Sequence, residues 1–297
     1  MSHKNAKRLR KEGQDRRQVN ARRDTVNLAN PKCPVNLIDG QTHLAYQLVR
    51  RQIDDVLIGE DGLLRILPAR VYADLPRPFL QIWAGEMGYH LFPTEELVEW
   101  IRGEIGGQTA IEICAGAGIL GRALGVPCID WDVCSRFPEV RLLYDMNRQG
   151  IPMIGPHCEK IEALEAVAKY QPEVVFGGYI TQRSLPGDPT SMAGSFAGVD
   201  ERELIRHVRK YIVVGSLGTH GKKKIWRDRT RDLSPDWIVT RSANPEDQII
   251  AVWENPSPVP VGDLAPAKNA AQVLDLYSQA RVSRGEGTAQ PLMRQLR

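Results

Sequence analysis

A glycine turn is the part of this sequence whose residue types and spacing are best suited to chemistry. Gly116, Gly118 and Gly121 follow an apolar run, residues 109–114, and open an amphipathic stretch, residues 118–124. Glycine lets the backbone approach a ligand closely, and the first turn of a helix presents unpaired N–H groups. Taken alone, this GxGxxG spacing indicates a dinucleotide cofactor.

Two acidic residues change that interpretation. Glu112 lies inside the apolar run ahead of the turn, and Asp130 ends the next apolar run, residues 126–130. With the turn, they resemble the class I S-adenosylmethionine-dependent methyltransferases, in which the first strand reads acid-x-Gly-x-Gly-x-Gly and an acid ends the second strand. Glu112, Gly116 and Gly118 match the first motif, with Cys114 in place of its first glycine, and Asp130 matches the second.

This resemblance implies a fold, a cofactor and a set of binding residues. The cofactor is S-adenosyl-L-methionine, with its ribose hydroxyls on Asp130, its adenine stacked on Trp131, and His157 near the ring. Three alternatives stay open: Asp132 competes with Asp130, Trp131 is a packing residue, and His157 is an ordinary loop histidine. The residues expected to bind the cofactor are Glu112, Cys114, Ala115, Gly116, Gly118, Asp130, Trp131 and His157.

The methyl acceptor is expected beside the end of the fourth strand, because the family places it there. Neither the (D/N/S)PP(Y/F/W) motif of base-amino methyltransferases nor the Pro-Cys nucleophile of cytosine-C5 enzymes occurs at this place. RNA, protein and small-molecule acceptors therefore stay open. Strand ends of a parallel sheet face the ligand crevice, so Tyr179, Gln182 and His220 are the catalytic candidates. His220 would serve as a base near neutral pH, or else as a solvated or phosphate-contacting loop residue.

Alternating apolar runs and amphipathic stretches supply the elements that must position these residues. The predicted helices between the strands imply crossovers and a parallel sheet, whereas the short link between the last two strands predicts an antiparallel hairpin. The fold class is therefore α/β, a Rossmann-like doubly wound sheet that is mostly parallel, with a C-terminal antiparallel hairpin strand and an N-terminal helical extension. Strands are expected at 109–114, 126–130, 151–154, 173–179, 211–217, 236–242 and 248–254, and helices at 41–57, 94–105, 118–124, 138–149, 159–170, 200–210 and 268–281.

Changes in composition divide the chain into four parts. Residues 1–35 form a basic arm and residues 36–107 a helical and irregular extension, in which 60–92 show no clear periodicity. Residues 108–255 form the methyltransferase-like domain, and residues 256–297 a proline-rich linker and tail. Within the domain, residues 183–198 are long enough to form a lid over the site.

Charge is concentrated at the N-terminus. Residues 1–24 hold 9 basic and 3 acidic residues, a charge of +6, and the remaining 30 basic and 33 acidic residues give −3. A cationic segment without aromatic residues suits phosphate backbones, so nucleic acid is the expected partner, through residues 1–24 and Lys222, Lys223 and Lys224. The alternative is a solubilising tail without a specific partner.

Composition also restricts the class of protein. With 42% hydrophobic and 25% charged residues in 297, the chain is too apolar for disorder throughout. It has neither an apolar stretch of roughly 18 residues nor a signal-peptide core, which predicts a cytoplasmic protein without membrane contact. Five cysteines without a CxxC pair predict reduced thiols and no metal site.

The sequence thus predicts S-adenosylmethionine-dependent methyl transfer to an unidentified acceptor, with nucleic acid favoured. The similarity indicates a bacterial or phage branch of the superfamily and carries no substrate with it. Two alternatives remain: an NAD(P)-dependent oxidoreductase built on the GxGxxG turn, and a non-catalytic module that keeps the fold to bind nucleic acid or protein.

Overall fold

A six-stranded sheet forms the centre of the computed structural model, which describes residues 40–185, 194–242, 244–264 and 268–283. Its strands lie in the order β3-β2-β4-β7-β10-β8. The bounds are β3 (Cys128–Ile129), β2 (Ala110–Ile113), β4 (Val174–Gly178), β7 (Lys210–Ser216), β10 (Gln248–Glu254) and β8 (Arg231–Leu233). Strands β3, β2, β4 and β7 are parallel, and β10 is antiparallel to both of its neighbours. The expected mostly parallel α/β sheet is confirmed.

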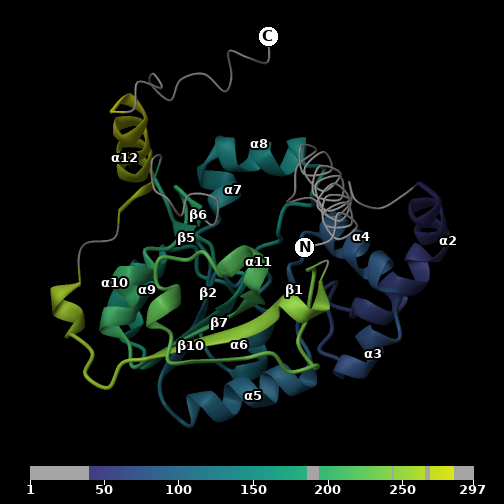
Figure 1. Cartoon of the computed structure of the whole chain (residues 1–297), viewed down its shortest axis with the longest axis horizontal. Helices are drawn as coiled ribbons and strands as arrows, with labels where there is room; N and C mark the ends of the chain where they lie inside the picture. The colour runs from purple at the N-terminus through teal and green to yellow at the C-terminus, as the bar shows by residue number, and fades with distance from the viewer. Residues whose placement is uncertain (1–39, 186–193, 243, 265–267, 284–297) are drawn as a thin grey trace, which may run out of the picture.

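Helices cover both faces of this sheet (Figure 1). Because side chains alternate along a strand, Val174 and Phe176 of β4 pack in the cluster that contains α5 and α6, and Val175 packs with α9 and α10. The helices are α5 (Glu95–Ile105), α6 (Ile119–Leu124), α9 (Ala163–Tyr170) and α10 (Glu201–His207). Burial on both faces is typical of parallel strands joined by crossover helices.

Local sequence sets the ends of α5. The Thr94 hydroxyl accepts a hydrogen bond from the Leu97 N–H at 3.0 Å, and Gly106 ends the helix with a φ of 56°. A side-chain cap satisfies one N–H of the first turn, and glycine adopts a left-handed conformation without steric strain. The predicted start and stop of this helix are confirmed.

The predicted hairpin between residues 236–242 and 248–254 is wrong. The first segment contains β9 (Val239–Thr240), which pairs with β1 (Leu91–Phe92) in a separate two-stranded sheet. The antiparallel partner of β10 at the sheet edge is β8 instead. The Thr240 N–H bonds to the side chain of Gln248 rather than to a β10 backbone carbonyl, so the backbone of β9 is left to pair with the N-terminal extension.

The strand expected at residues 151–154 does not form either. Its flanking glycines bond elsewhere: the Gly150 N–H donates to the carbonyl of Gly85 and the Gly155 N–H to the carbonyl of Gly116, at 2.8 and 2.9 Å. The segment therefore connects the N-terminal extension to the glycine turn instead of extending the sheet.

Two helices lie in residues 60–92, which showed no clear periodicity. They are α3 (Ala69–Ala73) and α4 (Arg77–Met87), and they pack with α2 (Gly40–Leu57). Pro68 and Pro76 occupy the positions just before the two helices, and proline is well tolerated at a helix start. Trp83 of α4 is fully buried and donates a hydrogen bond from Nε1 to Asp54 of α2. The extension forms its own apolar cluster, which reaches Ile119 at the start of α6.

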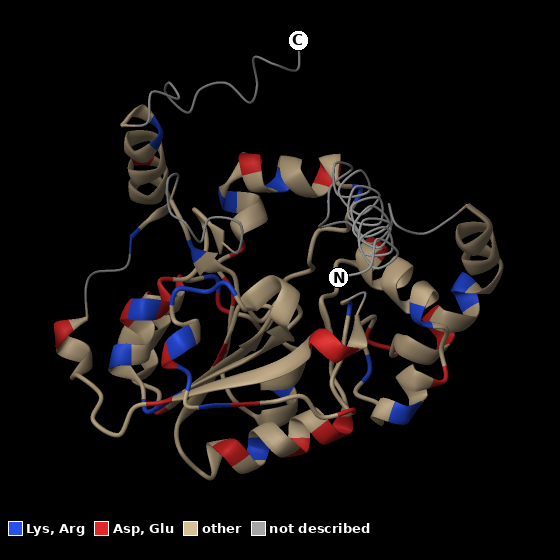
Figure 2. Cartoon of the chain, viewed as in Figure 1, with Lys and Arg blue, Asp and Glu red and all other residues tan. Residues whose placement is uncertain are grey.

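Several further elements complete the described structure. They are α7 (Val133–Arg136), α8 (Pro138–Met146), β5 (Gln182–Arg183), β6 (Gly194–Ser195), α11 (Leu217–His220) and α12 (Ala270–Val282), with single 3-10 turns at Trp226–Asp228, Pro245–Asp247 and Val261–Asp263. Acidic and basic residues lie mainly on helices and loops, and the central strands carry few (Figure 2). Among the helices of the described ranges, none has the length and apolar character needed to cross a membrane.

Candidate cofactor cleft

A cleft of about 1350 Å³ opens where the parallel strands end. Its lining comes from the glycine turn after β2, the segment after β3, the end of β4 and the segment after β7. The N-terminal extension and the β9 region close the opposite side through His90 and Arg241. This is the crevice at strand carboxyl ends where open α/β sheets bind ligands.

Asp130 joins the glycine turn to the end of β3. One of its carboxylate oxygens accepts a hydrogen bond from the Gly116 N–H at 2.9 Å, and the other accepts from the Asp132 N–H at 2.8 Å. Burial raises the pKa of Asp130 above its ordinary value. Each carboxylate oxygen has a second lone pair, and Asp130 lines the cleft, so it retains capacity for ligand hydroxyls.

Glu112 holds the turn from within the protein. Its Oε2 accepts a hydrogen bond from the Gly121 N–H at 2.8 Å, which satisfies one N–H of the first turn of α6. Burial raises its pKa to about 8. A Cβ atom on Gly121 would lie 2.9 Å from this carboxylate, so glycine is required for the close approach of α6 to β2.

Cys114 stands where the resemblance expects a glycine, and its backbone shows why. Its φ is 52°, in the left-handed region that glycine adopts easily, and Gly116 and Gly118 follow with φ of 52° and 66°. Cys114 and Ala115 both line the cleft. The turn therefore presents its backbone and one thiol to a ligand, with no bulky side chain in between.

An aromatic wall follows Asp130. Trp131 lines the cleft, and its ring packs edge-on against Phe137 with centroids 5.2 Å apart. Asp132 also lines the cleft, but its carboxylate is engaged by Lys160 at 2.8 Å. Partial burial acts to raise the pKa of Asp132, but hydrogen bonds from Lys160 and Ser135 and the charge of Lys160 together outweigh it, so the pKa is lowered. Of the two acids, Asp130 is the one without a basic partner in an ion pair among the described residues.

His157 lies behind the turn and is not among the cleft-lining residues of the described chain. Its Nε2 is 3.1 Å from the carbonyl oxygen of Gly118, and the residue is exposed. Six of the eight expected cofactor residues line the cleft, and Gly118 and His157 do not.

Tyr179 directly follows β4 and lines the acceptor side of the cleft. Its ring contacts the rings of His90 and His220, with centroid distances of 5.4 and 5.1 Å. Burial raises its pKa, which keeps the phenol protonated near neutral pH. Arg241 donates a hydrogen bond to His90 Nδ1 at 2.9 Å. His90 and Arg241 were not predicted from the sequence, since neither lies near a motif.

His220 and Gln182 are not among the described residues that line the cleft. His220 is 2% exposed, and its Nδ1 accepts a hydrogen bond from the Ser216 N–H at 3.0 Å. Burial first, and then nearby Lys223, lower its pKa to about 3, so the ring is neutral and a weak base. Gln182 is buried and accepts a hydrogen bond from the Lys224 N–H at 2.8 Å. This geometry favours packing roles for His220 and Gln182.

The three consecutive lysines have three different surroundings. Lys222 is exposed and lines the cleft, whereas Lys224 is half-buried and donates to the carbonyl of Arg183. Lys223 is buried and paired with Glu201, so it is not available to a polyanion. The other expected partner segment, residues 1–24, lies outside the described residues, as do residues 186–193 of the expected lid.

Comparisons with known proteins add little to this geometry. No protein-family model matches the chain, and no curated protein matches it. Among solved structures, Thermoplasma acidophilum protein 1320 is similar over 54% of this chain and 86% of its own, with 15% identity and a TM-score of 0.28. A similarity at that level carries no functional argument, so function is inferred from the site itself.

Proposed function

We propose that the chain binds S-adenosyl-L-methionine in the cleft and transfers its methyl group to an acceptor held near Tyr179. The observation that carries the proposal is the position of Asp130. Its carboxylate ends β3, lines the cleft and is fixed by the Gly116 N–H of the glycine turn. That is the acid and the turn on which the resemblance to class I methyltransferases depends.

The direction of β10 in the sheet also supports the methyltransferase class. The resemblance implies a sheet that closes with an antiparallel strand, which dinucleotide-binding folds do not have. Here β10 runs antiparallel between β7 and β8. The parallel strands alone are compatible with either class, so β10 favours the methyltransferase.

The chemistry of the lining fits the cofactor. Asp130 offers carboxylate oxygens to the ribose hydroxyls, and Trp131 offers an aromatic face or edge for the adenine. The Asp130 carboxylate also complements a cofactor that carries sulfonium and ammonium charges. The same carboxylate would repel the 2′-phosphate of NADP.

Positioning is the main contribution expected of the protein residues. The bound cofactor supplies an electrophilic methyl group, and the acceptor needs its lone pair in line with that group. Tyr179 stays protonated, so it serves as a hydrogen-bond donor that orients the acceptor and not as a base. Lys222 and Arg241 place positive charge at the cleft, which favours a nucleic-acid acceptor, together with the basic residues 1–24.

Equilibrium binding measured by calorimetry tests the proposal. The full-length protein should bind S-adenosyl-L-methionine more tightly than NAD⁺ or NADP⁺. Asp130→Ala should weaken the binding by roughly 10- to 150-fold, since hydrogen bonds to a charged group contribute about 1.5–3 kcal/mol. Asp132→Ala is the matched control and should change the affinity little. Tight dinucleotide binding with no binding of the sulfonium cofactor would contradict the proposal.

A further inference from the structure

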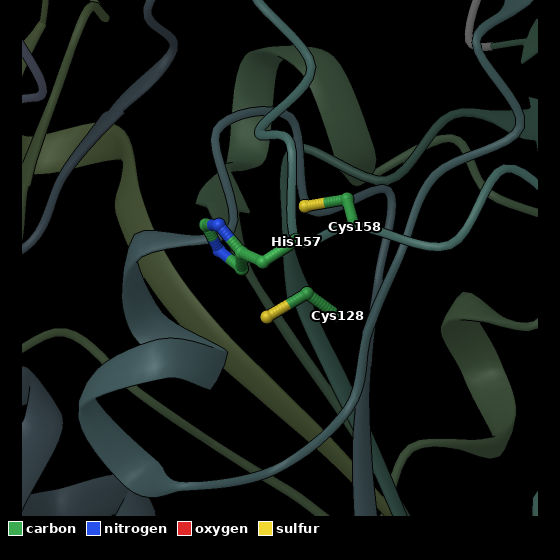
Figure 3. Close-up of side chains that lie close together, drawn as sticks. All are labelled: Cys128, His157 and Cys158. Atoms are coloured by element: carbon green, nitrogen blue, oxygen red, sulfur yellow. The ribbon is translucent and has the colours of Figure 1, made fainter.

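Two thiols and an imidazole meet on the side of the glycine turn that faces away from the cleft. The thiol–imidazole cluster consists of Cys128, His157 and Cys158, whose ligand atoms all lie within 4.8 Å of one another (Figure 3). Both thiols are buried, at 5% and 7% exposure, and the imidazole is exposed. Cys128 and Cys158 are thirty positions apart, which is why their spacing in the sequence gives no metal motif.

The backbone holds the two cysteines side by side. The Glu159 N–H donates to the carbonyl of Cys128 at 2.8 Å, and the Asp130 N–H donates to the carbonyl of Glu159 at 3.0 Å. These bonds form a parallel bridge between Ile129 and Glu159. The bridge places the preceding residues, Cys128 and Cys158, side by side. The cluster is therefore set by main-chain pairing and does not depend on side-chain rotamers alone.

The missing side chain of Gly118 leaves the space in which the cluster converges. A Cβ atom at this position would lie 2.5 Å from His157 Nε2 and 2.6 Å from Cys158 Sγ, and 3.1 Å from the Cβ of Cys128. In the structure the ligand atoms bond to carbonyl oxygens of the turn: Cys128 Sγ and His157 Nε2 to Gly118, and Cys158 Sγ to Gly116. Two of the three ligand atoms therefore lie beside the space that Gly118 leaves, and the third, Cys128 Sγ, lies within 4.8 Å of both.

We propose that this cluster binds a zinc ion through Cys128 Sγ, Cys158 Sγ and His157. Sulfur and imidazole nitrogen are the ligands that zinc prefers, and two thiolates neutralise its charge. Binding converts each thiol to a thiolate and releases two protons to solvent, with no change of oxidation state. The exposed side of His157 leaves the fourth position open to water.

The movement that zinc requires is small. Zinc lies about 2.3 Å from sulfur and about 2.0 Å from nitrogen, so ligand atoms in a tetrahedral site are about 3.5–3.8 Å apart. Contraction from at most 4.8 Å needs about 1 Å of side-chain rotation. The ion would link residues 155–159 to β3 next to the glycine turn. This inference does not rest on the proposed function, since it concerns the opposite side of the turn.

Zinc binding to the reduced, chelator-treated full-length protein tests the proposal, with a chromophoric chelator as competitor. We expect one zinc ion per chain, and a hundredfold or greater loss of affinity in Cys128→Ser, Cys158→Ser and His157→Ala. His157→Cys should restore the affinity, because a third thiolate is also a zinc ligand. Cys134→Ser and His43→Ala are the matched controls and should bind zinc as the wild type does.

Cobalt gives a second readout that does not depend on stability. Co²⁺ bound in the site should show thiolate-to-cobalt charge-transfer absorption, which Cys128→Ser and Cys158→Ser should weaken and Cys134→Ser should not. His157 is exposed, so His157→Ala is expected to fold and keeps the test valid if a buried cysteine variant does not. Wild-type protein that binds no zinc under reducing conditions, or binds it equally well in His157→Ala, would overturn the proposal.

Discussion

The two halves of the cleft are built in different ways. The cofactor half comes from one continuous stretch, residues 112–132, whose geometry is fixed by backbone N–H groups that bond to Glu112 and Asp130. The acceptor half is assembled from His90, Tyr179 and Arg241, which lie far apart in the chain. The cofactor half can be recognised from the spacing of its residues in the sequence, because its bonds are local. The acceptor half forms only when distant parts of the chain pack together.

The largest expected effect concerns the buried ion pair beneath the segment that follows β7. Lys223 and Tyr211 both donate a hydrogen bond to Glu201. The side chains of Lys223 and Glu201, which form the ion pair, are almost completely buried. Lys223→Ala would leave a carboxylate buried without its partner and should lower the free energy of unfolding by about 3–5 kcal/mol. Lys222→Ala, one residue away and exposed, should change it by less than about 0.5 kcal/mol. Denaturant unfolding of both variants measures the difference, and equal effects would contradict this account of the segment.

Next in size is a pH effect in the cofactor half. The pKa of Glu112 is raised from 4.5 to about 8 by burial, so the folded state favours the neutral acid. The stability contributed by this group is complete below about pH 4.5 and is lost as the pH rises through about 8. Glu112→Gln stays neutral and can still accept from the Gly121 N–H. It should match the wild type at pH 5 and exceed it by roughly a few kcal/mol at pH 9. Parallel loss of stability in both proteins would show that Glu112 does not titrate in this way.

A variant of Tyr179 separates the halves by function. Tyr179→Phe removes one hydrogen bond to the acceptor, worth about 1.4 kcal/mol, and should slow methyl transfer about tenfold with unchanged cofactor affinity. Asp130→Ala should instead weaken cofactor binding, and the rate of methyl transfer should fall because less cofactor is bound. Steady-state rates combined with calorimetry check this pair. If Tyr179→Phe weakens cofactor binding instead, the division of the cleft is incorrect.

The smallest effect tests the conformation of the turn. Cys114 has a φ of 52°, so Cys114→Gly should change the free energy of unfolding by less than about 1 kcal/mol. Cys114→Val should be less stable than Cys114→Gly by roughly 1–2 kcal/mol, since branched side chains are strained at positive φ. Thermal unfolding of the two variants gives the comparison. A valine variant as stable as the glycine variant would argue against the left-handed turn.

Periodicity and capping were sufficient to predict much of the fold. Helix α5 has its signals within the segment itself, namely Thr94 at the start and Gly106 at the end. The alternation of apolar runs and helices was likewise sufficient for the parallel sheet. The edge of the sheet was not predictable, because β8 carries the charged residues Arg231 and Asp232 and has no apolar pattern. The pairing of β9 with β1 joins residues about 150 positions apart, which no local signal encodes.

The site shows the same division. The glycine turn and Asp130 could be identified because their spacing is local, and the structure brings them together. His220 looked suitable as a base on account of its type and its position after a strand, but its ring is buried and neutral. Burial decides the protonation state, and it depends on which elements pack around the residue. His90 has no motif and reaches the cleft only through the packing of the N-terminal extension.

Transfer of a labelled methyl group tests the central claim most directly. The full-length protein would be incubated with S-adenosyl-L-methionine labelled in its methyl group and with separate fractions of RNA, DNA, protein and small metabolites. The account predicts label in a nucleic-acid fraction, an amount that falls with Tyr179→Phe, and almost none with Asp130→Ala. Absence of label from every fraction, in a protein that also fails to bind the cofactor, would contradict it.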